Sequence, residues 1–194
     1  QNFSAGANVG MIFMMAIEQD WDELNFSIKA FQNTMMRLRY SSIPVVAAPH
    51  GMALGGGCEI CLHADKVIAN AETYMGLVEF GVGLIPGGGG TKEFVVRLND
   101  ELKDGDIRTN QLRNRFLTIG QAKVSTSGKE AFEIGYLREG QDEVIVSRAH
   151  QIGYAKQQVL LMDAKGYVEK PQRTDIEVMG NEGIGIVYVG AHSM

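Results

Sequence analysis

The chain has 194 residues, of which 45% are hydrophobic and 21% are charged, and its formal net charge is −5. This composition is that of a globular protein with enough apolar residues for one substantial core. The acidic balance argues against non-specific nucleic-acid binding, which needs a basic face. No apolar run reaches the ~20 residues of a membrane-spanning helix. We therefore expect neither a nucleic-acid partner nor a membrane span.

The first residues of the chain and its two cysteines indicate the cellular compartment that we expect for the protein. The first residue is Gln1, and no basic start followed by an apolar core marks a signal peptide. Cys58 and Cys61 have the spacing of a redox pair or of half a zinc site. Because no second pair exists, we interpret them as buried thiols in a reducing compartment. We expect a piece of a longer cytoplasmic protein, with the mitochondrial matrix as the alternative location, and no bound metal.

The first half of the chain predicts helices and short strands in alternation. Asn8 is a candidate N-cap, and it precedes a Met-rich stretch, 11–20, which we expect to pack in the core or, alternatively, to cover a ligand. Apolar residues at helical spacing predict an amphipathic helix over 24–40, which ends before Pro44. The sequence then predicts strands at 45–48, 66–69 and 73–76 and helices at 57–64 and 91–98. This order is typical of an α/β fold.

The second half carries weaker signals. Residues 99–121 are polar, and their apolar residues are too loosely spaced to predict a helix. A helix over 128–134 is predicted to end at Gly135, and a second helix is predicted over 142–165. The segments 176–180 and 186–190 predict two short strands. We expect one domain over 1–165 and, over 166–194, a linker or the start of a following module.

Two glycine clusters each lie near one carboxylate. Residues 53–59 read ALGGGCE and end at Glu59, whereas residues 77–91 read LVEFGVGLIPGGGGT and contain Glu79. A helix that opens at the first cluster leaves N–H groups free to stabilise developing negative charge. Two carboxylates that converge on one water can act as its base and acid. Each glutamate alone is explained more simply as a solvated surface charge, but the pair favours a catalytic site.

Both glycine segments closely resemble the signature of the enoyl-CoA hydratase/isomerase (crotonase) family. Residues 3–8, which read FSAGAN, resemble the first oxyanion loop of the same family. The resemblance covers residues 3–165 and implies a crotonase-like α/β fold, a spiral of ββα units with C-terminal helices, without the strands that usually precede the first loop. It implies an acyl-CoA thioester as the ligand, with coenzyme A as part of the substrate and no tightly bound cofactor.

The resemblance also implies roles for individual residues. The N–H groups of Ala5 and Gly56 would hold the thioester oxygen as it becomes an enolate. Glu59 and Glu79 would activate water and deliver it across the C2=C3 bond, and the sequence does not decide which is the base. The remaining site residues would position water or contact the substrate: Pro86, Gly87, Gly6, Ala7, Asn8 and Gly55. Asn8 departs from the usual aspartate, which we expect to alter loop capping or coenzyme A contacts more than the chemistry.

We therefore expect a 2-enoyl-CoA hydratase of fatty acid β-oxidation. An isomerase that moves a double bond and a thioester hydrolase are the nearest alternatives, and a non-catalytic crotonase-like binding module is the rival of another class. The tail from residue 164 is similar to hydratase segments inside long 3-hydroxyacyl-CoA dehydrogenase polypeptides. We expect such a fusion, in which any NAD would bind to a dehydrogenase domain elsewhere, or else a homo-oligomer as in many family members.

Several other features favour ordinary structural roles. The run 87–92 lacks the Gly-Lys-Ser/Thr order of a phosphate-binding loop, and no nicotinamide-binding glycine pattern is visible. His63 and Asp65 are expected to be structural. Three lysines are candidate contacts for coenzyme A phosphates, but a solvated surface position is the simpler interpretation of each: Lys92, Lys123 and Lys129.

Overall fold

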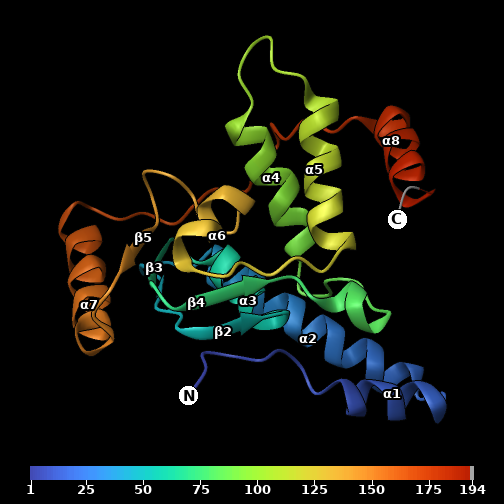
Figure 1. The fold of residues 1–194 in the computed structure, drawn as a ribbon. Coiled ribbons are helices and arrows are strands. Elements are labelled where there is room, and N and C mark those ends of the chain that lie inside the picture. The colour runs from blue at the N-terminus through green and yellow to red at the C-terminus, as the bar shows by residue number, and fades with distance from the viewer. Residues whose placement is uncertain (193–194) are drawn as a thin grey trace.

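The computed structural model describes residues 1–192, which fold into short parallel sheets surrounded by helices (Figure 1). One parallel sheet has three strands in the order β1 (Val46–Ala47), β3 (Lys66–Asn70) and β5 (Glu143–Ile145). A second parallel pair joins β2 (Gly51–Leu54) to β4 (Thr73–Gly76). Parallel neighbours require a crossover connection, and the crossover from β2 to β4 contains α3 (Gly56–His63).

The segment that precedes the first helix lies along the edge of β2. Ser4 forms a parallel bridge with Ala53. The Ser4 N–H donates to the Met52 carbonyl at 2.9 Å, and the Leu54 N–H donates to the Ser4 carbonyl at 3.0 Å. These bonds align the loop after Ser4 with the glycine turn that opens α3.

The core is centred on α3. Its side chains Cys58, Cys61 and Leu62 are fully buried in one cluster with Phe94 and Tyr136, whose rings stack with centroids 5.4 Å apart. Both thiols are free, and burial raises the pKa of the Cys61 thiol to about 12. A thiol protonated at neutral pH is a poor nucleophile and metal ligand, in keeping with buried structural cysteines.

Most predicted helices form, with ends shifted by a few residues. They are α2 (Trp21–Arg39), α3, α4 (Gly90–Glu101), α6 (Gly128–Ile134) and α7 (Arg148–Ala164). The predicted cap is also present, because Asn8 Oδ1 accepts a bond of 3.3 Å from the Met11 N–H at the start of α1 (Val9–Ile17). The helix predicted over 142–165 is shorter than expected, since its first residues form β5.

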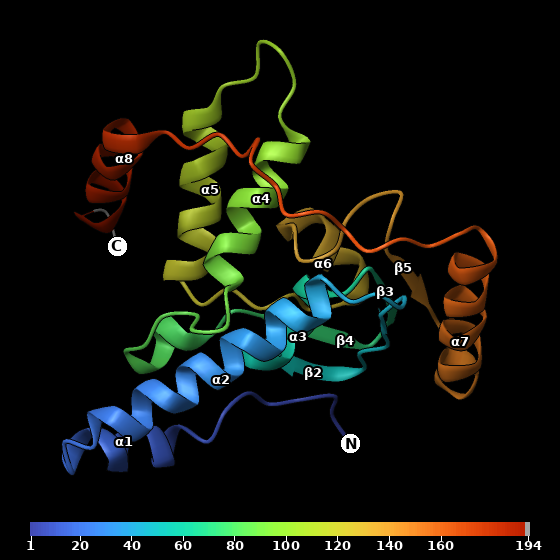
Figure 2. The ribbon, with the colours of Figure 1, turned by 180° about the vertical axis from the view of Figure 1, so that it is seen from behind.

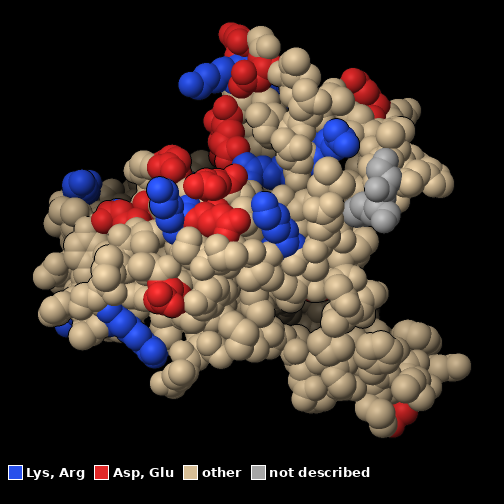
Figure 3. Space-filling view, viewed as in Figure 1, with Lys and Arg blue, Asp and Glu red and all other residues tan. Residues whose placement is uncertain are grey.

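The main errors concern α1, α5 and α8. The expectation that the Met-rich stretch packs in the core is wrong, because α1 has no buried residue and Met11, Phe13 and Ile17 are exposed. Figure 3 shows the lobe at the lower right, where α1 lies, with almost no charged side chain on this face.

The polar segment 99–121 contains α5 (Arg108–Gly120). The predicted C-terminal strands are wrong, because residues 176–179 are irregular and α8 (Gly180–His192) spans 186–190. The helix α8 packs on α5 through small residues. A Cβ added at Gly183 would lie 3.4 Å from Leu112, and one added at Gly190 would lie 3.0 Å from the Phe116 ring. Tertiary packing has overridden the local β-branched composition.

An extended segment, 166–179, crosses the molecule between α7 and α8, as seen from behind in Figure 2. The Tyr167 hydroxyl donates to Asp65 Oδ2 at 2.9 Å, and Lys170 pairs with Asp65 Oδ1 at 2.7 Å. Further along, Arg173 pairs with Asp100 of α4 at 2.5 Å. The proposed domain boundary near residue 165 stays a prediction. Within residues 1–192, no helix combines the length and apolarity needed to cross a bilayer.

Two glycines of α8 give a matched test of its docking. Gly185 faces open space, whereas an added Cβ at Gly190 meets Phe116. Gly185→Ala should stabilise the helix by about 1 kcal/mol, because alanine loses less backbone entropy than glycine. Gly190→Ala should give no stabilisation or should destabilise the helix, because its Cβ would lie 3.0 Å from the Phe116 ring. Amide hydrogen exchange across 180–192 measures both, and equal protection in the two variants would contradict the docking of α8 on α5.

Candidate active site

The first glycine cluster forms the turn that opens α3. Gly55 has φ +52° and ψ −124°, which only glycine adopts readily. Gly57 lies so close to the first segment that an added Cβ would be 2.5 Å from the Ser4 Cβ. Glycine at both positions is therefore required for the turn and for the approach of residues 3–6.

Glu59 lies in the first turn of α3 with its side chain almost fully buried. Its carboxylate accepts bonds from the second glycine cluster: the Gly90 N–H at 2.8 Å and the Gly88 N–H at 2.9 Å to Oε1 and 3.1 Å to Oε2. Burial raises the pKa of the Glu59 carboxyl, while these N–H groups and the nearby Lys92 oppose the rise. The two glycine clusters thus meet at one carboxylate.

Glu79 begins a short 3-10 helix, η1 (Glu79–Val82), and is half-buried. Its Oε1 would lie 3.3 Å from a Cβ added at Gly55, so the carboxyl rests against bare backbone. Its Oε2 is buried and has no hydrogen-bond partner among the described residues. Burial, with a smaller contribution from the charge of Glu59, raises the pKa of the Glu79 carboxyl to about 7. The two glutamates therefore lie near one another in different environments.

Three backbone N–H groups near the carboxyls are available to a ligand. Gly56 is the first residue of α3, where N–H groups have no intrahelical acceptor. The N–H groups of Ala5 and Gly87 have no acceptor within residues 1–192. Ala5 itself is exposed and follows the bridge between Ser4 and β2. The arrangement offers main-chain donors beside a buried and a half-buried carboxyl.

The other predicted site residues occupy the two loops around this point. Gly6 lies with its Cα 3.7 Å from the Cβ position of Gly55. Ala7 is exposed, and Asn8 caps α1, so the side chain of Asn8 is engaged in helix capping. Pro86 is buried in the turn before Gly87. The structure thus brings the residues of all three motifs together around the first turn of α3.

Two residues of α2 also lie at the site, although no motif in the sequence indicates them. The Phe31 ring lies 2.9 Å from the Cβ position of Gly56 and 2.4 Å from that of Gly88, so it covers both glycines. The Gln32 side-chain amide donates to the Gly87 carbonyl at 2.9 Å. The helical stripe marked Phe31 as apolar, but no local signal indicates that α2 crosses the glycine turns.

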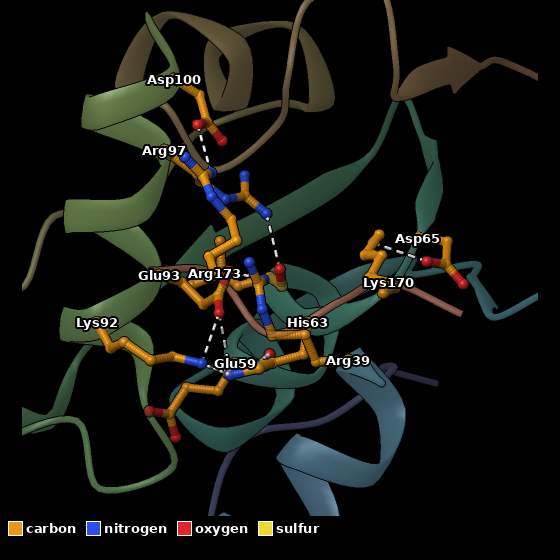
Figure 4. Close-up of polar contacts among 12 residues, drawn as sticks. Arg39, Glu59, His63, Asp65, Lys92, Glu93, Arg97, Asp100, Lys170 and Arg173 are labelled. Carbon is orange, nitrogen blue, oxygen red and sulfur yellow. Dashed lines mark hydrogen bonds and ion pairs between the residues drawn. The ribbon is translucent and has the colours of Figure 1, made fainter. Parts of the chain in front are cut away.

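A group of charged side chains adjoins Glu59 on the side of α4 (Figure 4). Glu93 accepts ion pairs from Arg39 at 2.6 Å and from Lys92 at 2.7 Å. Lys92 also lies 3.1 Å from His63 Nε2, so it is not the simple surface lysine that we expected. His63 is buried, and its structural contact is to the Glu59 carbonyl at 2.7 Å.

No group of three or more His, Cys, Asp and Glu side chains within residues 1–192 is arranged to hold a metal ion. Two cavities lie away from the glutamates. One, of about 730 Å³, lies between α4, α5 and α6, and an apolar one of about 380 Å³ lies between α4, α5 and α8. Neither is lined by Glu59 or Glu79.

Comparison with known proteins assigns the family. Residues 1–101, just over half of the chain, match the sequence profile of enoyl-CoA hydratase/isomerase. The chain belongs to the enoyl-CoA hydratase/isomerase family. The resemblance drawn from the three glycine-containing motifs is therefore confirmed at the level of the family.

Related proteins of this family are much longer than the chain. The "Probable 3-hydroxyacyl-CoA dehydrogenase" of Bacillus subtilis (strain 168) is 43% identical over 194 residues, which cover all of this chain and 24% of that protein. The "Putative fatty acid oxidation complex trifunctional enzyme" of Rickettsia felis is 40% identical over 126 residues, which cover 65% of this chain and 17% of that protein. The chain spans about a quarter or less of these relatives.

Solved structures confirm the predicted fold. The enoyl-CoA hydratase from Bacillus halodurans superposes with a TM-score of 0.66 at 17% identity, over 98% of this chain and 62% of that one. The enoyl-CoA hydratase from Shewanella pealeana superposes with a TM-score of 0.61 at 19% identity, over 98% and 57%. At these identities the likeness concerns the fold, which is the crotonase-like fold.

The raised pKa of Glu79 predicts a pH-dependent stability. A carboxyl whose pKa is about 7 when folded and near its ordinary 4.5 when unfolded binds its proton more tightly in the folded state. Its contribution is complete below the unfolded value and is lost as the pH rises toward 7. The free energy of unfolding of the wild type should therefore fall relative to that of Glu79→Gln between about pH 5 and pH 7. Above pH 7 the difference between the two proteins should stay constant.

Denaturant unfolding at a series of pH values measures this difference, with Glu139→Gln as the exposed control. Parallel curves for wild type and Glu79→Gln would contradict the buried, unpaired state of the Glu79 carboxyl.

Proposed function

We propose that this chain is the hydratase centre of a multifunctional fatty acid oxidation protein and adds water across the C2=C3 bond of 2-enoyl-CoA thioesters. The observation that carries the proposal is the meeting of two carboxyls and free main-chain N–H groups at the first turn of α3. Membership of the family and the names of the longer relatives support it.

The backbone donors suit the thioester oxygen. When water adds at C3, negative charge passes to this oxygen, and preorganised N–H groups stabilise it without any change in their own protonation. We assign this role to Ala5 and Gly56, which approach each other because residues 3–6 run beside β2 and the turn at Gly55. Removal of one such donor typically costs about 10²–10³ in rate.

The two carboxyls suit opposite roles. Glu79, whose pKa is raised to about 7 and whose Oε2 has no partner within residues 1–192, can hold a proton at neutral pH and give it to C2. Glu59, held by two N–H groups, is the better carboxylate base toward water. Water would lose a proton to Glu59 as its oxygen bonds to C3, and the C2=C3 electron pair would pass to the enolate before Glu79 protonates C2. Proton exchange with solvent then restores both groups.

The turn before α4 suits the positioning of this water. The Gly87 N–H has no acceptor among the described residues, and the Gly87 carbonyl accepts a bond from the Gln32 side-chain amide. The Phe31 ring covers the neighbouring glycines and limits access of bulk water to Glu59. We therefore assign water positioning to Gly87 and to the turn at Pro86, and contacts with the coenzyme A part of the substrate to the exposed loop 6–8 and to Gly55.

The rest of the parent protein is also part of the proposal. We infer a fusion with a 3-hydroxyacyl-CoA dehydrogenase, whose NAD would bind outside this chain, because the Bacillus subtilis relative that carries this name is about four times as long. The cytoplasmic location and the homo-oligomer stay predictions.

Hydration of crotonyl-CoA, followed as the loss of enoyl absorbance, tests the proposal. Glu59→Gln and Glu79→Gln should each slow the reaction by about 10² or more, the usual scale of general acid–base catalysis. Glu139→Gln, on the exposed surface, should leave the rate unchanged. Hydration at the wild-type rate by both active-site variants would overturn the assignment, and double-bond migration without hydration would favour an isomerase.

A further inference from the structure

Four side chains from three helices form an ion cluster next to Glu59. Glu93 Oε2 pairs with Arg39 Nη1 of α2 at 2.6 Å, and Glu93 Oε1 pairs with Lys92 Nζ at 2.7 Å. His63 of α3 is the fourth member of the cluster, with Nε2 at 3.1 Å from Lys92 and 3.5 Å from Glu93 Oε1. Figure 4 shows Lys92 reaching from α4 toward Glu93 and His63.

The partners of His63 fix its protonation. Its Nδ1 lies 2.7 Å from the Glu59 carbonyl, which only accepts, so Nδ1 carries the hydrogen. Its Nε2 faces the Lys92 ammonium, which only donates, so Nε2 is the acceptor. Both contacts assign the same neutral tautomer, and burial lowers the pKa of His63 to about 4. His63 is therefore uncharged at neutral pH.

With His63 neutral, the cluster contains two cations and one anion. Arg39 and Lys92 both form ion pairs with the single carboxylate of Glu93, so the cluster has one positive charge in excess. The nearby anion that can balance it is Glu59, which is almost fully buried and receives only N–H donors from the glycine turn. A buried carboxylate is costly unless it is paired or hydrogen-bonded. The excess positive charge of the cluster therefore stabilises the ionised form of Glu59.

We propose that Lys92 is a positioning residue of the catalytic centre, whose ammonium keeps Glu59 ionised and ready to act as a base. This inference rests on the proposed hydratase function and deepens it. Lys92 is suited to the role because Glu93 and His63 hold its head group in place while part of the side chain stays exposed. It acts through Glu59 and not on the thioester, which departs from the coenzyme A contact considered from the sequence.

Titratable groups from several neighbouring elements surround Glu59 and Lys92. Glu59 faces Lys92 of α4, Glu79 of η1 and the neighbouring Cys58 thiol. Lys92 faces Glu93, Arg39 of α2, His63 and Glu59. Loss of the lysine leaves Arg39 and Glu93 as a neutral pair, so Glu59 must then ionise with help from backbone donors alone.

The test compares pH profiles of kcat/KM for hydration of crotonyl-CoA. In Lys92→Met the acidic limb should move to higher pH by about half a unit to one unit, the size of a partly solvated charge contact. Lys92→Arg should restore the wild-type limb, and Lys156→Met, at an exposed lysine of α7, should leave it in place. Glu93→Gln should move the acidic limb to lower pH, because it removes a negative charge near Glu59. A purely structural role of the cluster would not produce opposite shifts in the two variants.

A direct readout separates this inference from the proposed function. The Glu59 carboxyl, labelled with carbon-13 and assigned through Glu59→Gln, should titrate at higher pH in Lys92→Met than in the wild type. Wild-type protein that does not hydrate contradicts the proposed function, while the carbon-13 titration still tests Lys92. An unmoved titration in a Lys92→Met or Lys92→Gln protein with native circular dichroism would overturn the inference.

Discussion

The structure depends on one interaction, the carboxylate of Glu59 held by the N–H groups of Gly88 and Gly90. It joins the start of α3 to the start of α4 across 29 and 31 residues of sequence. A carboxylate buried to this degree would be strongly disfavoured in an apolar setting. Backbone donors that cannot be neutralised make its ionised form tolerable and also fix its direction.

The glycines around this carboxylate are important because they have no side chain. A Cβ at Gly88 would lie 2.6 Å from Glu59 Oε2, and a Cβ at Gly57 would lie 2.5 Å from the Ser4 Cβ. Neither approach is possible with a side chain, so the glycines allow two loops to close on one helical turn. The positive φ of Gly55 aims the α3 amides outward from the same turn. Geometry and chemistry are therefore set by the same few residues.

The two glutamates differ because their surroundings differ. Glu59 is almost fully buried and accepts bonds from the Gly88 and Gly90 N–H groups, whereas Glu79 is half-buried and its Oε2 has no hydrogen-bond partner among the described residues. Two like charges in a shared site push their pKa values apart. An unpaired carboxyl that titrates near neutral pH and an anchored carboxylate form a suitable acid and base. The ion cluster of Arg39, Lys92 and Glu93 adds a third influence from outside the substrate site.

The sequence predicted those parts of the site whose chemistry is carried by short motifs. Glycine runs and glutamates identify themselves locally, and the cap at Asn8 and the helix over residues 56–63 follow from local preferences. Phe31 and Gln32 were missed because their role depends on where α2 crosses the turns, which no local pattern encodes. The same holds for α8. Its Ile- and Val-rich sequence locally favours a strand, but the packing of Gly183 and Gly190 against α5 stabilises a helix. The ion pair between Lys92 and Glu93 joins adjacent residues, but its burial against Arg39 is a tertiary property.

The most direct test of the account is a crystal structure of the protein with a non-reactive enoyl-CoA analogue bound. We expect the thioester oxygen at about 2.7–3.1 Å from the N–H groups of Ala5 and Gly56, the distance of a formed oxyanion hole. We further expect the carboxyls of Glu59 and Glu79 both to face C2 and C3. An analogue bound elsewhere, or with its reacting carbons turned away from either glutamate, would contradict it.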